Sequence, residues 1–217
     1  MAARLTRAEQ KEATRSRLLD SAATVFARAG MQQASIDQVA EHAGFTKGAF
    51  YANFESKEEL FLAMLDDRFA KHLEEIDRVL DSDAEPEDQA RAGAASFVDF
   101  ISSDPEWERL FFEFSAYASR NETFRLELVA RRRELQERMA ERYRKRADEL
   151  GVEPPFPMEE IARMTFAMAD GIALQKLLDP ESVSDDMYPT MLATFFAGVR
   201  AAVEEREAAA ATAAAAT

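Results

Sequence analysis

Apolar residues recur along this chain at spacings of three and four, which is the pattern of helices that bury one face. The first such run includes Leu18, Ala22 and Phe26, and it predicts a helix over roughly 8–29. Gly30 follows directly, and glycine commonly ends a helix because it adopts the left-handed conformation without strain. A long amphipathic helix is therefore predicted ahead of this glycine.

Two much shorter helices are predicted next. Ser35 is placed to cap the first of them, and Gln38 can reach back to complete a capping box. Gly44 can close that helix, and Thr46 is placed to cap a third helix over 47–53. Helices of about two turns are marginal alone, so both need support from a neighbouring helix.

A further capping box, Ser56 with Glu59, opens a long helix that runs through Leu80. Polar and acidic residues follow over 81–88, and the tail beyond 206 is almost all alanine and either prolongs the last helix or frays. We predict an all-α protein with about nine helices. The remaining five helices are expected over 86–103, 105–118, 122–150, 158–178 and 185–205, and the domains over 1–57 (helix-turn-helix), 58–206 (larger helical domain) and 207–217 (Ala-rich tail without assigned function).

The composition supports this fold class and removes several kinds of chemistry. Only seven Gly and seven Pro occur among 217 residues, and no long run alternates apolar and polar residues as a strand would. The absence of cysteine excludes disulfides, thiolate metal sites and cysteine nucleophiles. The segment 187–199 is the longest uncharged stretch with bulky apolar residues and is too short to span a bilayer. The first residues lack the apolar core of a signal peptide, so we expect a cytoplasmic protein.

The charge is distributed unevenly. The formal net charge is −14, which argues against nonspecific coating of nucleic acid or anionic membranes. Residues 1–57 nevertheless hold eight Lys/Arg against six Asp/Glu, while residues 58–217 hold 19 against 35. Such an asymmetry suggests two tasks in one chain, although a small excess of charge in the first segment is also compatible with chance.

The segment 35–57, SIDQVAEHAGFTKGAFYANFESK, carries the functional prediction. Two short helices joined at a glycine are typical of a helix-turn-helix, in which the second helix reads DNA. This reading helix, about 46–53, has an amino-terminal end that offers free N–H groups and partial positive charge to a phosphate. The residues predicted to face outward from it are Thr46, Lys47, Gly48, Ala49, Tyr51 and Ala52.

These residues resemble the amino-terminal domain of TetR-type transcriptional regulators. The resemblance covers about the first quarter of the chain, and its aromatic pair and its capped Lys-Glu-Glu-Leu run make it specific. It implies a homodimeric regulator, a repressor, that binds a palindromic double-stranded DNA operator and is released by a small, largely hydrophobic effector bound in the larger domain. We expect no cofactor, metal ion or membrane partner. The positions that carry the resemblance are Arg17–Ala22, Phe26, Gly30, Ile36, Val39–Ala40, Ala43–Gly44, Lys47–Gly48, Phe50–Tyr51, Phe54 and Ser56–Leu60.

The resemblance implies DNA contacts, each of which has a simpler alternative. It assigns the Tyr51 hydroxyl and the Lys57 ammonium to phosphates, whereas Tyr51 is otherwise a half-buried aromatic. Lys47 either reaches a phosphate or a guanine edge, or is only a solvated charge. Ser35 and Gln38 either contact DNA or only cap the second helix.

The remaining positions of the reading helix predict limited contact with bases. Gly48 lets the helix approach the DNA backbone closely. Ala49 and Ala52 offer only methyl groups, which favour a thymine methyl. Family members often carry a larger polar residue, commonly His, where Ala52 stands, so recognition here is expected to depend more on DNA shape.

Eight of the 21 aromatic residues lie within 97–124. Aromatics at helical spacing either form a core or line a cavity, and the resemblance implies a small-molecule pocket. Glu113 and Asp170 flank this set and either hold a cationic ligand or face solvent. The predicted pocket residues are Phe97, Phe100, Trp107, Phe111, Phe114, Tyr117, Met139, Met164, Phe166, Met168 and Asp170.

The last two predicted helices interleave small and apolar residues, which permits close helix approach. They pair either with a twofold copy or, as an internal hairpin, with the core; the resemblance favours the dimer. Arginine runs at 131–133 and 142–146 alternate with glutamates and are typical of an ion-paired surface, not of a second nucleic-acid site. The residues predicted at the dimer interface are Ile172, Met191, Phe195, Phe196 and Val199.

Two other functions fit the sequence less well. A carboxylate-bridged metal enzyme needs Glu-x-x-His pairs, but the residues three positions before His42 and His72 are Val39 and Phe69. No HExxH, P-loop or GxSxG motif occurs. An all-α ligand-binding or scaffolding bundle without DNA binding is the main alternative, and the presence of Tyr51 and Lys57 argues against it.

Overall fold

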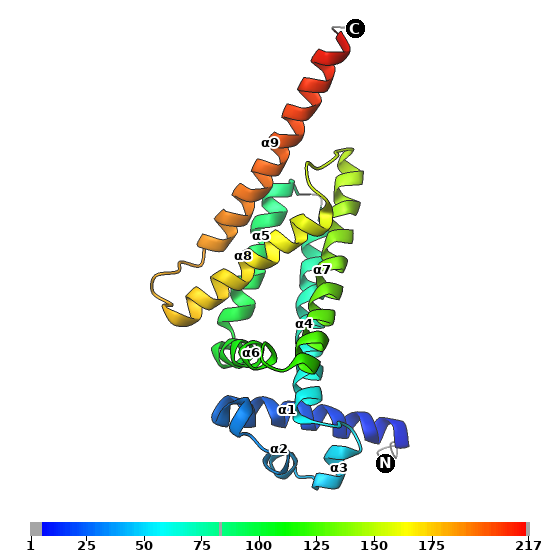
Figure 1. Cartoon of the computed structure of the whole chain (residues 1–217), viewed down its shortest axis with the longest axis vertical. Coiled ribbons are helices and arrows are strands. Elements are labelled where there is room, and N and C mark those ends of the chain that lie inside the picture. The colour runs from blue at the N-terminus through cyan, green and yellow to red at the C-terminus, as the bar shows by residue number, and fades with distance from the viewer. Residues whose placement is uncertain (1–5, 83, 216–217) are drawn as a thin grey trace. The chain divides into compact units, whose positions relative to one another are not determined.

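The computed structural model describes residues 6–82 and 84–215, and every regular element among them is an α-helix (Figure 1). The predicted all-α fold of about nine helices is therefore confirmed. In this part of the chain the helices are α1 (Arg7–Gln33), α2 (Ile36–His42), α3 (Lys47–Tyr51), α4 (Lys57–Leu80), α5 (Pro86–Ser102), α6 (Pro105–Ala118), α7 (Glu122–Leu150), α8 (Met158–Leu178) and α9 (Met187–Ala215).

The last helix differs most from its predicted bounds. α9 begins at Met187 and continues to Ala215, beyond the predicted end at 205. Alanine has the highest helix propensity of all residues, so the Ala-rich tail prolongs the helix. The side chains over 204–213 are exposed. Residues 1–5 of the predicted first domain, residue 83 of the acidic stretch and residues 216–217 of the tail lie outside the described residues.

Gly30 interrupts α1, as its position after the first apolar run predicts. Its backbone lies at φ 71° and ψ 159°, which is far from helical geometry. A short turn over 31–33 follows the kink, and the Ala34 N–H closes it by donating to the Gly30 carbonyl at 3.1 Å. The chain then enters α2 at its cap, Ser35.

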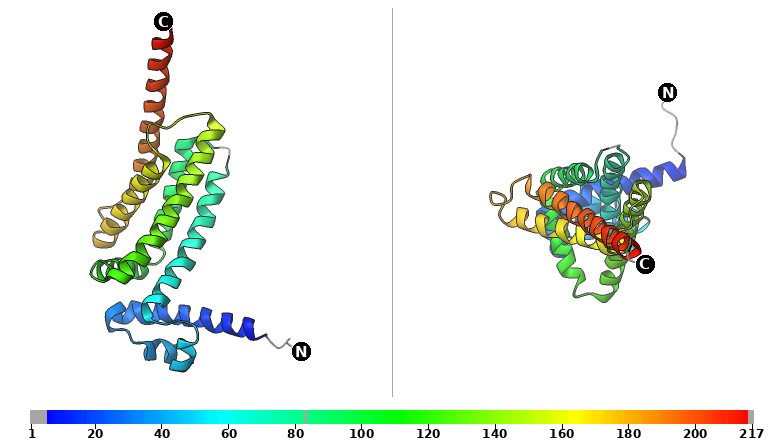
Figure 2. Two further views of the ribbon diagram at one scale, coloured as in Figure 1. Left: turned by 45° about the vertical axis from the view of Figure 1, so that its right-hand side comes forward. Right: turned by 90° about the horizontal axis from the view of Figure 1, so that it is seen from above.

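The described residues form two compact units. The first unit contains the chain up to Lys71 together with Glu106–Leu128, so it holds α1, α2, α3, most of α4 and α6. The second contains His72–Pro105 and the chain from Val129 onward, so it holds α5, α8, α9 and most of α7. Within the first unit, α2 and α3 lie on one side of α1 (Figures 1 and 2).

Aromatic side chains of α4 and α6 form the centre of the first unit. The Phe61 ring stacks on Phe114, with ring centroids 4.0 Å apart, and on Trp107 at 5.5 Å. The same cluster includes Phe26 and Phe50 of the helix-turn-helix. Burying one such side chain contributes about 1.5–3 kcal/mol. The helix-turn-helix is therefore anchored on α4 and α6 through a shared core.

In the second unit, α9 lies along α5 and also contacts α8 (Figure 1). The carboxy-terminal part of α9 continues past both helices (Figure 2). The arginine runs of α7 are ion-paired, as predicted: Arg142 Nη2 lies 2.6 Å from Asp77 Oδ2, and Arg144 Nη2 lies 2.6 Å from Glu159 Oε1.

Two negative findings concern the described residues alone. None of their helices combines the length and the apolar composition that a bilayer span requires. They also contain no group of three or more His, Asp or Glu side chains close enough to hold a metal ion.

Candidate nucleic-acid interface

Side-chain caps define the short helices of the helix-turn-helix. The Ser35 hydroxyl accepts from the Gln38 N–H at 3.2 Å, and Gln38 Oε1 accepts from the Ser35 N–H at 2.8 Å. The predicted capping box is therefore confirmed. Thr46 Oγ1 accepts from the Ala49 N–H at 3.3 Å and caps α3 in the same way. These caps satisfy backbone donors that a helix of five to seven residues otherwise leaves open.

The turn between α2 and α3 is fixed from α1. Gly44 adopts φ +74°, the left-handed conformation predicted for it. Arg17 Nη2 donates to the Ala43 carbonyl at 2.9 Å, and its guanidinium lies 4.8 Å from the centroid of the Phe45 ring. Beneath α2, the Ser21 hydroxyl donates to the Val39 carbonyl at 3.0 Å. Polar contacts from α1 therefore hold both α2 and the turn that follows it.

The residues predicted to face DNA are gathered on the outer side of this motif. Of the outward set on α3, all are exposed except Ala49, which is half-buried. The Tyr51 side chain is 51% exposed while its neighbour Phe50 is fully buried. The two rings pack edge to face at 5.6 Å, so the buried ring holds the exposed one. Ser35 and Gln38 are also exposed at the start of α2, although their side chains form the capping box.

Lys47 has an acidic partner that the sequence prediction missed. Its ammonium donates to Asp37 Oδ2 at 3.1 Å and lies 3.0 Å from Oδ1. The hydrogen bond and the charge of Asp37 raise the pKa of Lys47, so the side chain stays cationic. Asp37 lies in the first turn of α2, where the helix dipole favours a carboxylate. A phosphate approaching α3 must therefore compete with Asp37 for this ammonium.

Gly48 is exposed, and the nearest atom to a Cβ built on it is Thr46 Oγ1 at 3.7 Å. The fold itself therefore accommodates alanine at this position. Alanine also has the higher helix propensity. The absence of a side chain at Gly48 is compatible with the predicted close approach of α3 to the DNA backbone.

Lys57 is engaged inside the first unit. Its ammonium donates to the carbonyls of Met31 at 2.8 Å, Gln32 at 3.1 Å and Ala34 at 3.3 Å. These three acceptors match the three N–H donors of an ammonium. In this structure Lys57 thus closes the end of α1, a contact that sequence reasoning did not foresee, while the phosphate contact stays a prediction.

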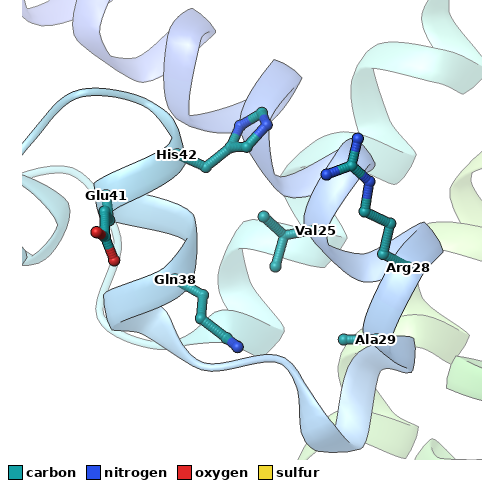
Figure 3. Close-up of a pocket in the computed structure, with 6 residues that line it drawn as sticks. All are labelled: Val25, Arg28, Ala29, Gln38, Glu41 and His42. Atoms are coloured by element: carbon teal, nitrogen blue, oxygen red, sulfur yellow. The ribbon is translucent and has the colours of Figure 1, made fainter.

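An open depression of about 330 Å³ lies between α1 and α2 (Figure 3). Val25 and Ala29 form its apolar part, and Figure 3 shows Arg28 and His42 on its rim with the Glu41 carboxylate turned away. None of the predicted ligand-pocket residues lines it.

In the first unit, three of the predicted pocket residues belong to the core. Phe114 is fully buried, while Trp107 and Phe111 are 7% and 8% exposed. They pack against α4, as the core alternative describes, and their place in a ligand pocket stays a prediction. The Tyr117 hydroxyl donates to Glu58 Oε1 at 3.2 Å. Burial and the nearby Glu58 carboxylate raise the pKa of this hydroxyl, so it stays a donor.

The predicted pocket residues of the second unit are packed less completely. Phe97, Phe100, Phe166 and Met168 are half-buried, Met139 is buried and Met164 is exposed. Phe97 meets the Tyr188 ring edge to face at 5.5 Å, and Phe100 stacks on His72 at 4.6 Å.

Both flanking carboxylates have partners. Asp170 Oδ2 accepts from Arg132 Nη2 at 2.5 Å, and Oδ1 accepts from Nη1 at 3.3 Å. Glu113 Oε1 accepts from the backbone N–H of Met31 at 3.1 Å. These contacts leave the choice between a cationic ligand and solvent a prediction for both carboxylates.

One residue of the predicted dimer interface lies inside its own unit. Ile172 is only 4% exposed, so it packs within its own unit, and its place at the dimer interface stays a prediction. The other four, on α9, are half-buried, and Phe196 packs edge to face on Tyr143 at 5.3 Å. The outer side of α8 is instead lined by an apolar stripe, which we call the α8 stripe: Met164, Ala167, Gly171, Leu174 and Leu178.

Two families of known proteins match this chain, one in its amino-terminal part and one in its carboxy-terminal part. The family described as bacterial regulatory proteins, TetR family, matches residues 18–64, and the family described as BetI-type transcriptional repressor, C-terminal, matches residues 86–201. The HTH-type transcriptional regulator YfiR of Bacillus subtilis, itself uncharacterised, is 30% identical over 182 residues, which cover 82% of this chain and 86% of YfiR.

Solved structures share the fold. A transcriptional regulator of Pseudomonas aeruginosa PAO1 matches with a TM-score of 0.74 at 18% identity, covering 94% of this chain and 96% of that one. The complex of SmeT with triclosan matches with a TM-score of 0.61 at 22% identity, covering 84% and 89%. At these identities the likeness shows a common architecture of helices.

Proposed function

The chain belongs to the TetR family of bacterial transcriptional regulators, and we propose that it is a repressor that binds a palindromic operator as a homodimer and is released by a small apolar effector. Its family consists of DNA-binding regulators and not of enzymes. A repressor of this kind acts where the chromosome is, in the cytoplasm.

The observation that carries the proposal is the exposed face of α3. Tyr51 presents its hydroxyl on a helix that a capping threonine and the buried Phe50 hold in place. Lys47 adds a cation at the first turn, beside the N–H groups that attract a phosphate. A phosphate contact from each, with a close approach at Gly48, fits a helix lying in the major groove.

The α8 stripe supports the homodimer. Leu174 is 41% exposed and Leu178 is 74% exposed, and together with exposed Met164 they lie along one side of the helix, where an exposed apolar surface indicates a contact with a partner. A Cβ built on Gly171 meets nothing within 4 Å among the described residues, and the same holds for Gly198 on α9. Small residues on an apolar face permit close helix packing, which a twofold copy of the same face supplies.

Two comparisons and two features of the second unit support the repressor role and the apolar effector. The carboxy-terminal family is described as repressors, and the fold relative SmeT was solved with triclosan, an apolar diaryl ether. In this chain the half-buried Phe97 and Phe166 supply apolar surface in the second unit. Asp170 is neutralised by Arg132, which favours an uncharged effector over a cation.

The test is footprinting on the DNA upstream of the protein's own coding sequence. We expect a palindromic protected site with wild type, and at least about tenfold weaker protection with Lys47→Ala/Tyr51→Phe, because each change removes a phosphate contact. Lys71→Ala is the matched control, since Lys71 is also an exposed lysine paired with an aspartate but lies on α4. Absence of a protected site with wild type, or equal protection by the double variant, contradicts the proposal.

Repression and effector binding are each measured separately. In vitro transcription from the protected promoter should fall when the protein is added, and a rise would make it an activator. Triclosan serves as the first apolar probe: a bound apolar compound should raise the melting temperature and weaken operator binding by a linked factor. A compound that stabilises the protein but leaves operator affinity unchanged does not act as an effector.

A further inference from the structure

A carboxylate from α6 enters the kink of α1. Beyond Gly30 the residues Met31–Gln33 form one isolated turn, which Ala34 closes onto the Gly30 carbonyl. The first N–H of this turn has no helical partner before it, because the kink redirects the preceding backbone. Glu113 Oε1 accepts from that N–H, on Met31, at 3.1 Å and so takes the place of a helix cap.

A cation from α4 holds the other end of the same turn. The Lys57 ammonium donates to the carbonyls of Met31, Gln32 and Ala34 at 2.8–3.3 Å. The turn therefore has a negative group at its amino end and a positive group at its carboxyl end, which is the arrangement that the helix dipole favours. We call Glu113, the turn over 31–34 and Lys57 the α1 clasp.

Gly30, at the kink, leaves room for the Glu113 carboxylate, which a larger residue would crowd. A Cβ built on Gly30 would lie 3.1 Å from both carboxylate oxygens of Glu113, and the backbone at φ +71° already favours glycine. The same helix α6 has a second polar contact with this unit, because Tyr117 donates to Glu58 in the first turn of α4. The turn leads directly into Ser35, the cap of α2, so whatever fixes the turn also fixes the start of the helix-turn-helix.

We propose that Glu113 is a positioning residue for DNA binding, through which α6 holds α2 and α3 in the orientation that fits the operator. Glu113 lies outside the predicted DNA-contact set and acts through the α1 clasp. The inference rests on the proposed function, whose regulation it specifies. Because a hydrogen bond of 3.1 Å is lost after a shift of about 1 Å, a small displacement of α6 releases the turn over 31–34 and loosens the helix-turn-helix.

Three variants separate the reach of the side chain from its charge. Glu113→Gln keeps an acceptor oxygen at the same reach, Glu113→Asp keeps the charge but withdraws it by one methylene, and Glu113→Ala removes both. Glu106→Ala is the control, since Glu106 is an exposed glutamate of the same helix. If the hydrogen bond to Met31 depends on the reach of the side chain, Glu113→Gln should retain it best. Glu113→Asp should then behave almost like Glu113→Ala.

The first measurement needs no DNA. Amide hydrogen exchange in the free, full-length protein should become about tenfold faster for Met31 and for the amides of α2 in the Asp and Ala variants, because a hydrogen bond to a charged acceptor is lost. Glu113→Gln and Glu106→Ala should exchange within about threefold of wild type. Lys57→Met, which removes the other end of the clasp, should also speed exchange of this turn.

The second measurement is affinity for the DNA fragment that wild type protects. We expect about tenfold weaker binding for the Asp and Ala variants, recovery with Gln, and an unchanged salt dependence because no phosphate contact is lost. If the Asp and Ala variants exchange faster but bind DNA with unchanged affinity, Glu113 is only a structural cap and the proposal is overturned. Unchanged amide exchange in these variants, or a reduced salt dependence of their DNA binding, would also overturn it. If wild type protects no DNA, the proposed function fails, while the exchange data still decide whether the clasp holds the turn.

Discussion

Helices α3 and α8 each present an exposed face, but the two faces differ in chemistry and in what holds them. α3 has five residues and exposes Lys47 and Tyr51, and it depends on a capping threonine and on buried Phe50 for its position. α8 has 21 residues and exposes Leu174 and Leu178 without needing a side-chain cap. A helix as short as α3 requires caps and buried neighbours, whereas α8 is held by a row of buried residues along its length.

The aromatic residues of the two units also differ, in how completely they are buried. In the first unit Trp107, Phe111 and Phe114 form a closed core, while in the second unit Phe97 and Phe100 are half-buried. Well-packed interiors respond as a whole to small changes, and incompletely packed ones leave surface for a ligand or partner. The three rings of the first unit are therefore needed to keep its core closed, whereas Phe97 and Phe100 retain accessible surface.

The largest expected effect is at the α8 stripe. Leu174→Arg should abolish the proposed homodimer, because twofold symmetry would bring an unpaired charge into the interface from both copies, at a cost of roughly 6 kcal/mol or more. The measurement is sedimentation at several protein concentrations. Leu150→Arg is the matched control, since Leu150 on α7 is 44% exposed against 41% for Leu174. A Leu174 variant that still sediments as a dimer would remove α8 from the interface.

The second prediction tests the difference in packing. Phe114→Ala should lower the unfolding free energy of the first unit by about 3–5 kcal/mol, because the emptied space adjoins the rings of Phe61 and Tyr117. The fluorescence of Trp107, the single tryptophan, reports on this unit during urea unfolding. Phe97→Ala in the second unit should cost roughly half as much or less. Equal losses for the two variants would contradict the contrast between the units.

The smallest expected effect concerns pH. Burial raises the pKa of the Tyr143 hydroxyl in the second unit to about 12. The folded state then holds this proton more tightly than the unfolded state, whose pKa is about 10. The resulting stability is fully present below about pH 10 and is lost as the pH rises through about 12, by on the order of 2 kcal/mol.

Urea unfolding between pH 8 and pH 11.5, followed by circular dichroism, measures this dependence. Tyr143→Phe should remove part of the alkaline loss. Tyr51→Phe, which changes an exposed tyrosine of α3, should leave it intact. The same alkaline loss in Tyr143→Phe as in wild type would show that this hydroxyl does not titrate with unfolding.

Local features were predictable from the sequence because neighbouring residues determine them. The capping box of Ser35 with Gln38, the cap at Thr46 and the break at Gly30 each need only a few adjacent positions, and all three are found in the structure. The Ala-rich tail is helical for a similarly local reason, the high helix propensity of alanine. The outward face of α3 also follows from local spacing once Phe50 is taken as buried.

Contacts between distant segments were not predictable in this way. Glu113 and Met31 are 82 positions apart, and Arg132 and Asp170 are 38 apart, so no local pattern joins either pair. Ile172 and Leu174 are both apolar residues of one helix, and only the packing of that helix reveals that the first is buried and the second exposed.

The sequence by itself determined the helices, the caps of α2 and α3 and the family to which the chain belongs, because helix periodicity and capping are encoded in short runs of residues. Only the tertiary structure decided which aromatics close the first core, which face of α8 is free, and that Lys57 and Glu113 hold the turn ahead of α2. Those properties depend on which surfaces meet after folding, and a side chain's type does not specify its partner.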